Sequence, residues 1–463
     1  MHPDGIMESG ALSKRLARTR CFCAIVVGES CKHTTQSQDG AMNQREDMGH
    51  ITGDRIVPGE FPGIGPDVAA TFNVPACVVV ANMEKSRTVP DLEPAKDAPV
   101  REPVSPEHRI VSRGMLHNVN GRLNVCGWMP VPLLRYDRSR IKGTRLRVKE
   151  WDRYLINDDE YALWVTVANL SYAALVSARV TNLVHPSSHA VSIITPLLGK
   201  RLVLPANSMG GITEFENRRG RFLCRAQNDE RRIIARFDKF LDGESLAIDA
   251  LLDYAPRESL SNVLAWPDDQ KSFHYHRVVP AMRASGSFKV GRRVHGFSPT
   301  RSFGLFAWNR GVLPYENEFR WAAAQGWQDG KGGSACDTHK VGLQFVQGMD
   351  ERHATQNAIF VDGRVVKLGE ATIDIPAADV STDGKSLSDR FDMLGAWHIS
   401  DCDGQVDLTF VPTKDTAEYV NAYAMFVDRH QVFGDFSGTV TVDGRPFVLR
   451  NLHGTTAIEH TRL

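Results

Sequence analysis

The sequence predicts an all-β protein made of two consecutive antiparallel β-barrels or sandwiches that follow a disordered N-terminal extension. Three observations support this fold class. Asn-Gly and Asp-Gly pairs recur after residue 107, short apolar and β-branched segments lie between them, and long amphipathic helical stretches are nearly absent. Many short strands in sequence order, without helices between them, are typical of antiparallel up-and-down sheets.

The first 106 residues differ from the rest of the chain. They contain only three aromatic residues, Phe22, Phe61 and Phe72, whereas all eight tryptophans follow residue 120. Prolines are frequent among charged residues from 87 to 106. Such a segment buries too little apolar area to offset the entropy of ordering its chain. We therefore expect residues 1–106 to be a disordered extension that ends in a proline-rich linker.

The middle of the chain reads as a meander of strands separated by polar turns. Turns are expected at 157–159, 217–220 and Asp242-Gly243. The segments expected to form strands are residues 144–156, 160–168, 173–183, 212–216, 221–226, 231–237 and 245–254.

Three hairpins are expected near the C-terminus, because Asp-Gly pairs accept the positive φ angles of a type I′ turn. They join residues 358–361 to 364–368, 396–400 to 405–411, and 438–442 to 445–449. Only residues 315–325 and 416–427 are compatible with helical turns. About 350 residues are too many for one eight-stranded barrel. We expect a join near residues 284–291, which gives β-barrel domains at 107–285 and 286–463.

Charge and cysteine usage restrict the partners and the compartment. The chain has 55 basic and 55 acidic residues, so it lacks the basic surface that nucleic acids require. No apolar run reaches the roughly 18 residues of a transmembrane segment. The eight cysteines form no Cys-x-x-Cys pair, and Cys21, Cys23 and Cys31 lie in the extension. Reduced thiols and a cytoplasmic location are therefore expected.

The common catalytic and cofactor motifs are absent from the sequence. It contains no phosphate-binding loop, no dinucleotide fingerprint, no Gly-x-Ser-x-Gly and no His-Glu-x-x-His. We accordingly predict neither a cofactor nor a metal. These absences argue against the common nucleotide-dependent and hydrolase classes.

The segment 149–154 is the first candidate site. Strand alternation places Glu150, Asp152 and Tyr154 on one face, and Lys149, Trp151 and Arg153 on the other. If the acidic face points inward, desolvation could make one carboxyl a general acid. The alternative is that Trp151 belongs to the core and the carboxylates face water or pair with arginines.

A second candidate is the pair His274 and His276. Residues two apart share one face of a strand, so both imidazoles could approach one metal with His295 as a third ligand. The glutamate expected shortly after such a pair is missing. A polar pair that lines a cavity or lies on a solvated face is the alternative that we favour.

A tryptophan-rich stretch supplies the remaining candidates, because tryptophan and arginine suit stacking at a pocket mouth. An irregular insert here would form either a binding loop or the plug of a barrel. The residues are Trp308, Arg310, Tyr315, Glu316 and Trp321.

Several short segments, taken in combination, point to a family. They are Gly127-Trp128 with Pro132-Leu133, residues 149–152, residues 283–286, residues 310–315 and residues 431–434. Together they resemble the uncharacterised bacterial and fungal family named domain of unknown function 2804, over residues 107–460. That family has no established reaction, so the resemblance implies no catalytic residue. In fold only, the architecture also resembles the paired lipocalin-like barrels of carotenoid hydratases and related cyclases.

Three functions remain open from the sequence. The first is binding of a hydrophobic or lipid-like small molecule in a lipocalin-like cavity. The second is a cofactor-independent hydratase, cyclase or isomerase that acts on an unsaturated hydrophobic substrate. The third is a pair of solidly packed barrels that serve as an interaction surface. The candidate catalytic residues are Glu150, Asp152, His274 and Glu316, and the candidate ligand-binding residues are Trp151, Tyr154, His276, Trp308, Arg310, Tyr315 and Trp321.

Overall fold

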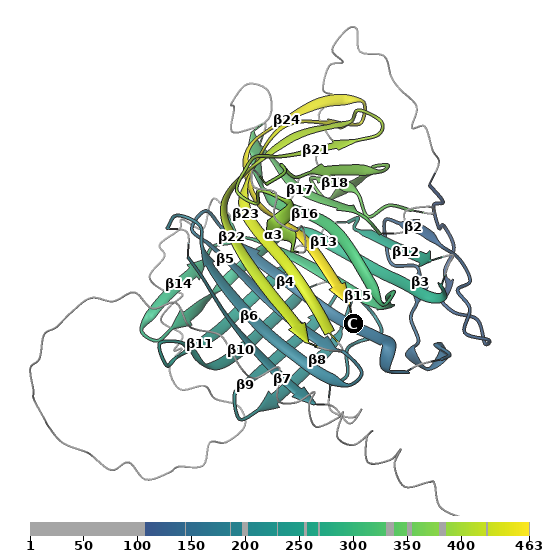
Figure 1. Cartoon of the computed structure of the whole chain (residues 1–463), viewed down its shortest axis with the longest axis horizontal. Helices are drawn as coiled ribbons and strands as arrows, with labels where there is room; N and C mark the ends of the chain where they lie inside the picture. The colour runs from purple at the N-terminus through teal and green to yellow at the C-terminus, as the bar shows by residue number, and fades with distance from the viewer. Residues whose placement is uncertain are drawn as a thin grey trace, which may run out of the picture. The chain divides into compact units, whose positions relative to one another are not determined.

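The computed structural model of the chain describes residues 107–462 except 144, 186, 197–201, 229, 254–256, 267–268, 330–337, 350–353, 379–385 and 423–424. The expected extension at 1–106, with Cys21, Cys23 and Cys31, lies outside these residues. The all-β class is confirmed, because the described part folds into two curled antiparallel sheets with almost no helix (Figure 1).

The first sheet has thirteen strands and curls into a half-barrel. Ten of them follow the order β7-β6-β5-β4-β15-β13-β11-β10-β9-β8; β12 and β14 pair with β13, and β2 pairs with β12. The strands are β2 (Gly127–Met129), β4 (Val148–Asn157), β5 (Tyr161–Asn169), β6 (Ala173–Asn182), β7 (Ser187–Pro196), β8 (Gly211–Asn217), β9 (Gly220–Gln227), β10 (Glu230–Leu241), β11 (Glu244–Asp253), β12 (Leu260–Trp266), β13 (Asp269–Val290), β14 (Arg293–Phe297) and β15 (Phe303–Val312).

The second sheet has nine strands in the order β19-β18-β17-β16-β24-β23-β22-β21-β20. Its three long C-terminal strands, yellow-green to yellow in Figure 1, cross in front of the first sheet in that view. The strands are β16 (Glu316–Asp329), β17 (Thr338–Gln347), β18 (Ala358–Val361), β19 (Arg364–Lys367), β20 (Ala371–Asp374), β21 (Trp397–Asp401), β22 (Val406–Ala422), β23 (Met425–Val442) and β24 (Arg445–Arg462).

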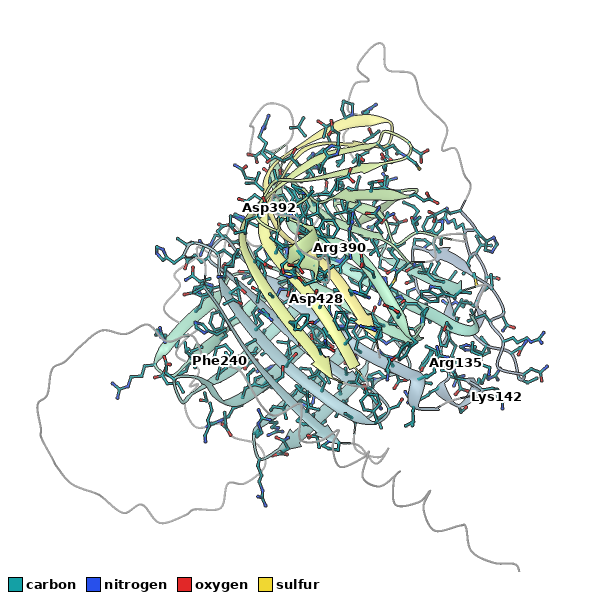
Figure 2. All side chains as sticks on the ribbon, viewed as in Figure 1. Arg135, Lys142, Phe240, Arg390, Asp392 and Asp428 are labelled. Atoms are coloured by element: carbon teal, nitrogen blue, oxygen red, sulfur yellow. The ribbon has the colours of Figure 1, made fainter. Side chains whose placement is uncertain are left out.

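Short elements complete the described part. The strands β1 (Gly114–Met115) and β3 (Leu134–Arg135) form a parallel pair, and η2 (Arg138–Arg140) and η3 (Arg145–Arg147) are 3-10 turns. The single-turn helix α3 (Leu387–Arg390) begins at a capping box. Its Leu387 N–H donates to the buried Asp428 carboxylate at 2.7 Å, which ties α3 to β23. Figure 2 labels Asp428 and Arg390, the last residue of α3.

The Asp-Gly hairpins form as antiparallel pairs, but the turn at 403–404 is not of type I′, because only its glycine has a positive φ. In the turns at 242–243, 362–363 and 443–444, the aspartate has φ near +50° and the glycine has φ near +80°. These are the angles of a type I′ turn, which matches the twist of the two strands that it joins. The pairs β18–β19, β21–β22 and β23–β24 are antiparallel.

The expected helical turns at 315–325 and 416–427 are wrong. The first lies almost entirely in β16 and the second lies in β22 and β23. Alanine and glutamate give both stretches a helical propensity, but long-range pairing with β24 and β23 overrides it. For the same reason residues 308–327 are not an irregular insert, because β15 and β16 account for most of them.

Three clusters of buried apolar side chains stabilise the two sheets. One fills the concave side of the first sheet, with Phe222, Phe237 and Trp308 among its members, and one fills the second sheet around Trp397 and Phe410. The third joins the two sheets; it includes Leu155, Trp164, Trp321, Ala323, Phe433 and Ala457. Burial on this scale contributes about 25 cal/mol for each Å² of apolar surface removed from water.

The chain passes from the first sheet to the second between Val312 and Glu316. The strands β14 and β15, both beyond residue 285, pair within the first sheet. The division into domains at residue 285 stays a prediction. No helix among the described residues is both long enough and apolar enough to cross a membrane.

A bulge in β13 ties the two sheets together. The register with β15 shifts between Val279 and Met282, and Ala281 adopts a φ of 55° there. The Ala281 N–H donates to the side-chain oxygen of Gln325 on β16 at 2.8 Å, and the Gln325 amide donates to Asn157 on β4 at 2.8 Å. A group from the second sheet thus satisfies a buried donor of the first.

Candidate functional site

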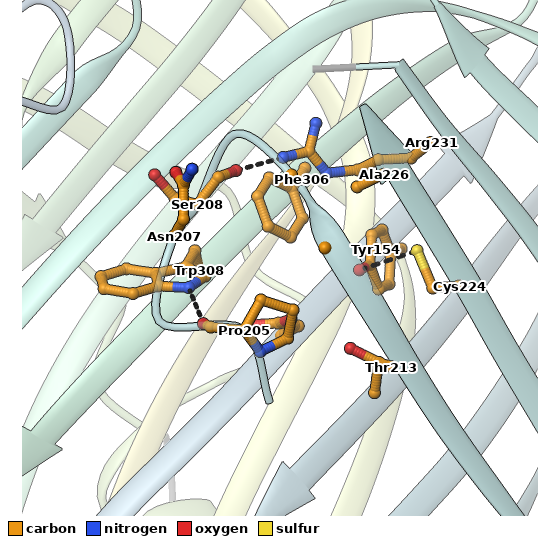
Figure 3. A pocket seen from close by; sticks show the side chains of 13 residues that line it. Tyr154, Pro205, Asn207, Ser208, Thr213, Cys224, Ala226, Arg231, Phe306 and Trp308 are labelled. Carbon is orange, nitrogen blue, oxygen red and sulfur yellow. Dashed lines mark hydrogen bonds between the residues drawn. The ribbon is translucent and has the colours of Figure 1, made fainter. Parts of the chain in front are cut away.

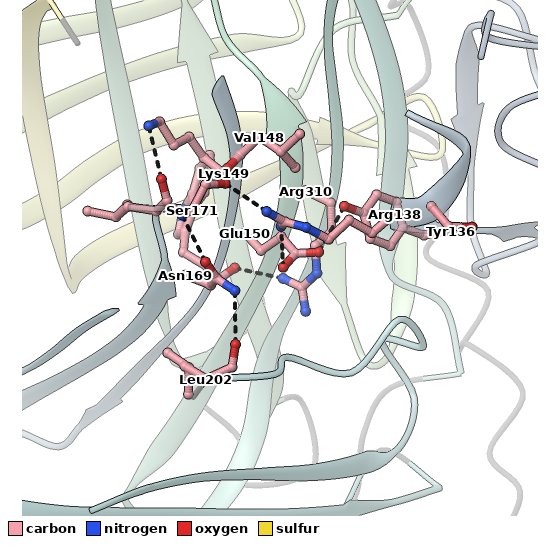
Figure 4. A network of polar contacts seen from close by, with 12 residues as sticks. Tyr136, Arg138, Val148, Lys149, Glu150, Asn169, Ser171, Leu202 and Arg310 are labelled. Atoms are coloured by element: carbon pink, nitrogen blue, oxygen red, sulfur yellow. Dashed lines mark hydrogen bonds and ion pairs between the residues drawn. The ribbon is translucent and has the colours of Figure 1, made fainter. Parts of the chain in front are cut away.

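The strand alternation expected for 149–154 is present in β4, and its acidic face points into the first half-barrel. Glu150 is buried there and accepts a hydrogen bond from the Tyr136 hydroxyl at 2.8 Å. Arg138 lies 2.6 Å from the other carboxylate oxygen (Figure 4). Burial, followed by the Glu150 charge, raises the pKa of Tyr136 strongly. Glu150 is therefore part of a satisfied polar network.

Asp152 pairs with Arg310 in the same interior. Arg310 Nη1 lies 2.8 Å from Asp152 Oδ1, and Arg310 Nη2 donates to the Pro205 carbonyl at 2.8 Å. The guanidinium also lies 4.3 Å from the Trp308 ring centre. Burial raises the pKa of Asp152, although the positive charge of Arg310 opposes that rise. Glu150 and Asp152 thus both pair with arginines, as in the second interpretation of segment 149–154.

A cavity of about 10 Å³ lies beside this pair, lined by Tyr154, Cys224, Phe306 and Trp308 (Figure 3). The Tyr154 hydroxyl donates to the Cys224 sulfur at 3.3 Å. Such a volume holds about one water molecule.

The segment 202–208 lies inside the half-barrel beside the Asp152–Arg310 pair. Its Leu202 and Leu204 side chains belong to the core, and its Ser208 carbonyl accepts from Arg231. Withdrawing the two leucines alone would cost about 3–6 kcal/mol. We therefore regard the segment as a structural plug.

The opposite face of the first sheet carries Trp151, His274 and His276. The Trp151 and His274 rings stack with centres 5.5 Å apart and planes 12° apart. His274 Nε2 lies 3.1 Å from the Asn309 side-chain oxygen, and His276 lies beside it. Burial lowers the pKa of His274 to about 4 and also lowers that of His276 well below its usual value, so both rings are neutral at pH 7.

The hypothetical third ligand of these histidines is elsewhere. His295 lies 2.7 Å from the Asp158 carboxylate, at the turn between β4 and β5. Among the described residues, no group of three or more His, Cys, Asp or Glu side chains is arranged to hold a metal ion.

Tyr315 and Glu316 lie apart from the other candidates. Tyr315 is 59% exposed, and Glu316 pairs with His460 at 2.8 Å on the surface. The structure therefore divides the candidate residues among the half-barrel interior, the opposite sheet face, the start of β16 and, for Trp321, a cleft between the sheets.

This inter-sheet cleft has a volume of about 90 Å³. Its first wall consists of residues from β4, β5, β6 and β7, and its second wall of residues from β16, β22, β23 and β24. The central side chain is Arg153, whose guanidinium carbon lies 5.9 Å from the Trp164 ring centre and 5.7 Å from that of Trp321. Both distances are within the range of cation–π attraction.

Carboxylates of the second sheet balance part of the positive charge. Arg429 lies 2.8 Å from Glu459 and 3.3 Å from Glu418, and the Trp321 indole donates to Glu459 at 2.9 Å. Burial alone would raise the pKa of Glu459, but Arg429, Arg153 and the indole lower it overall. Glu459 is therefore ionised at neutral pH.

Two arginines of the cleft form no ion pair among the described residues, although the charges of Glu459 and Glu418 act on Arg153 and that of Glu418 acts on Arg179. Arg153 takes part in no hydrogen bond or ion pair there, and Arg179 only approaches the Ser188 hydroxyl at 3.4 Å. The Trp164 indole N–H is also buried without a partner in that part of the chain. Three arginines against two carboxylates leave the cleft with an excess of one positive charge.

The sequence does not predict most residues of the cleft. Arg153 is assigned to the face of Trp151, and Trp321 is a candidate binding residue. Arg179, Arg429 and Glu459 carry no motif, and they meet only because β23 and β24 of the second sheet pack near β4 and β6 of the first.

The model of the family described as Domain of unknown function (DUF2804) matches residues 107–463. The chain belongs to this family. No curated protein matches it. The DUF2804 chain is similar in structure to kievitone hydratase from Nectria haematococca, with 11% identity, a TM-score of 0.38, and coverage of 67% of this chain and 88% of that one.

A second similar structure is a protein from Nitrosomonas europaea described as a candidate AttH. The identity is 10%, the TM-score 0.41, and the coverage 71% of this chain and 97% of that one. No residue role passes from either protein to the DUF2804 chain.

Two glycines of the family-like segments have a structural explanation. In the DUF2804 chain, a Cβ at Gly286 would collide with the Asp249 carbonyl on β11. A Cβ at Gly434 would collide with the Val411 carbonyl on β22. Both glycines thus allow close approach of neighbouring strands, which is a packing role.

Proposed function

We propose that this DUF2804 chain is a small-molecule-binding protein whose ligand occupies the inter-sheet cleft and presents an anionic group to Arg153. The observation that carries the proposal is the guanidinium of Arg153, which lies against a pair of contacting tryptophans without a hydrogen-bond acceptor among the described residues. A partly desolvated guanidinium that lacks an acceptor is costly, and an anion offsets this cost through charge-assisted hydrogen bonds.

The other groups of the cleft suit the same ligand. Arg179 adds a second positive charge, and the hydroxyls of Thr166, Ser177 and Ser192 can donate to oxygen atoms. A volume of about 90 Å³ accommodates the polar end of a ligand, whereas a whole drug-sized molecule needs about 300 Å³ or more. The remainder of the ligand would then extend beyond the cleft.

This proposal changes where the hydrophobic ligand expected from the sequence would bind. The interior of the first half-barrel is filled by its core and by the segment 202–208, beside a cavity of only about 10 Å³. The inter-sheet cleft has more room and an uncompensated positive charge. The ligand that it favours is therefore amphipathic instead of purely apolar.

The hydratase, cyclase or isomerase alternative has less support. It requires a protonated acid that faces a space the size of a substrate. Asp152 has a raised pKa, but it lies beside the small cavity and pairs with Arg310. Glu459 faces the larger cleft, but its pKa is lowered. Binding without catalysis fits both carboxylates better.

A cytoplasmic location remains part of the proposal. Cys224 and Cys402 are unbridged thiols, as is usual in a reducing compartment.

The test is native mass spectrometry of protein purified from its own host. Wild-type protein should retain a small molecule, and Arg153→Met should lose it, because methionine keeps the apolar stem and removes the charge. Arg232→Met is the matched control, since Arg232 pairs with Asp249 on the surface. An equal load of ligand in wild type and Arg153→Met would refute the proposal.

A further inference from the structure

We infer that the ligand is an amphipathic carboxylic acid whose apolar body lies across Trp151, Leu175 and Ile194, next to the arginines of the cleft. The inference rests on the proposed function and adds the chemical class of the ligand and the place of its apolar part. It follows from the strand register of the first sheet together with the exposure of the residues involved.

Three rows of side chains cross the outer face of β4, β5, β6 and β7. Directly opposed residues define each row, and successive rows are two residues apart along the strands. The rows are Leu155-Trp164-Arg179-Ala190, Arg153-Thr166-Ser177-Ser192 and Trp151-Ala168-Leu175-Ile194. The period of two in a strand places all three on one face.

The residues of the first two rows, except Leu155, line the cleft, and the third row continues beyond it. Two residues of a strand span about 6.6 Å, so the third row begins roughly that distance from Arg153. A carboxylate on Arg153 therefore has an apolar strip within the reach of a short alkyl or aryl chain.

The third row is apolar throughout and only partly covered. Trp151 and Leu175 are half-buried, and Ile194 is 39% exposed on β7, the strand at one end of the sheet order. Ala168 is buried between Trp151 and Leu175, and its small side chain projects little from the sheet. The stacking of Trp151 on His274 fixes the ring at one end of the strip.

Charge complementarity selects the occupant of this strip. The excess positive charge beside it favours an acid over a neutral lipid, and the apolar row favours a chain-bearing acid over a small inorganic anion. Glu418 and Glu459 form their ion pairs with Arg429, so the guanidinium N–H groups of Arg153 remain for the ligand.

The experiment titrates full-length protein with acetate, octanoate, dodecanoate, dodecanol and inorganic phosphate by calorimetry. Affinity should rise roughly two- to fourfold for each CH₂ added between acetate and octanoate. Dodecanol should bind at least about tenfold more weakly than dodecanoate, because it cannot form the charge-assisted hydrogen bonds.

Four variants separate the two parts of the site. Arg153→Met should weaken dodecanoate about tenfold or more, and Arg153→Lys should restore part of the preference for the acid over the alcohol. Ile194→Ser should weaken dodecanoate about threefold and leave acetate unchanged. Val294→Ser, at a 63% exposed position on β14, is the control for an apolar surface loss and should change neither.

The outcomes distinguish this inference from the proposed function. If acetate or phosphate binds as tightly as dodecanoate and only Arg153→Met matters, the amphipathic class is wrong and the anion site stands. If dodecanol binds as tightly as dodecanoate, the inference that the ligand is a carboxylic acid is wrong. If no probe binding depends on Arg153, both proposals fail. Circular dichroism of each variant checks that the sheets are intact.

Discussion

Arg310 Nη1 lies 2.8 Å from Asp152 Oδ1, and both side chains are almost completely withdrawn from water. The pair joins two adjacent strands, β15 and β4, inside the first half-barrel. A buried ion pair adds little over an apolar pair of the same shape, but the loss of one partner leaves the other charge uncompensated.

Asp152→Asn should therefore destabilise the protein by about 3 kcal/mol in urea unfolding at pH 7. Asp249→Asn is the matched control, because it removes the partner of the exposed Arg232 and should cost less than about 1 kcal/mol. Equal losses of unfolding free energy in the two variants would contradict this prediction, because they would mean that another group compensates the charge of Arg310.

Stability should fall in acid because of His274. Its pKa is lowered to about 4 by burial, with the Asn309 hydrogen bond acting in the opposite direction. The unfolded chain takes up a proton below about pH 6.5, whereas the folded protein does so only near pH 4. This histidine therefore costs no stability above pH 6.5, and about 3 kcal/mol is lost by pH 4.

The measurement is the free energy of unfolding between pH 7 and pH 4 in wild type and His274→Gln. The variant should lose less stability over this range, because it has no imidazole to protonate. Parallel pH curves for the two proteins would contradict the prediction.

The turn at 443–444 offers a clean test of backbone strain. A Cβ at Gly444 meets nothing within 4 Å, but its φ is +76°, a conformation that alanine adopts at a cost of about 1–2 kcal/mol. Gly444→Ala should lower stability by that amount. Gly296→Ala, in β14, also has open space but no positive φ, and thermal unfolding should show little change.

Cys224 should resist alkylation until the protein unfolds. It is 3% exposed, and burial raises its pKa to about 11, so the reactive thiolate is scarce. The exposed Cys402 should react with iodoacetamide first. Peptide mapping by mass spectrometry with and without denaturant measures both rates, and early labelling of Cys224 in native protein would reveal an opening of the first half-barrel.

The hairpins are predictable because their signal is local. Asp362-Gly363 and Asp443-Gly444 encode their own φ angles, and the flanking segments only have to pair with each other. The alternation in β4 is local as well. The expected helical turns at 315–325 and 416–427 were wrong because the pairing partners of these segments lie on other strands, which propensity ignores.

The cleft depends on contacts that are distant in sequence. Arg153 and Glu459 lie near opposite ends of the described chain, and the cleft that they line forms only when the two sheets pack. The sequence places Arg153 on the face of Trp151, but it does not reveal that this face meets the second sheet. Register and sheet packing supply the missing information.

Gln325 makes each sheet incomplete without the other. Its side chain accepts the N–H of Ala281 at the bulge of β13 and donates to Asn157 of β4, although Gln325 itself belongs to β16. A protein that ended after β15 would keep an unsatisfied donor and an uncovered apolar face. We therefore expect the two half-barrels to occur together in one chain and to unfold in a single transition. Neither half-barrel should function as an independent domain.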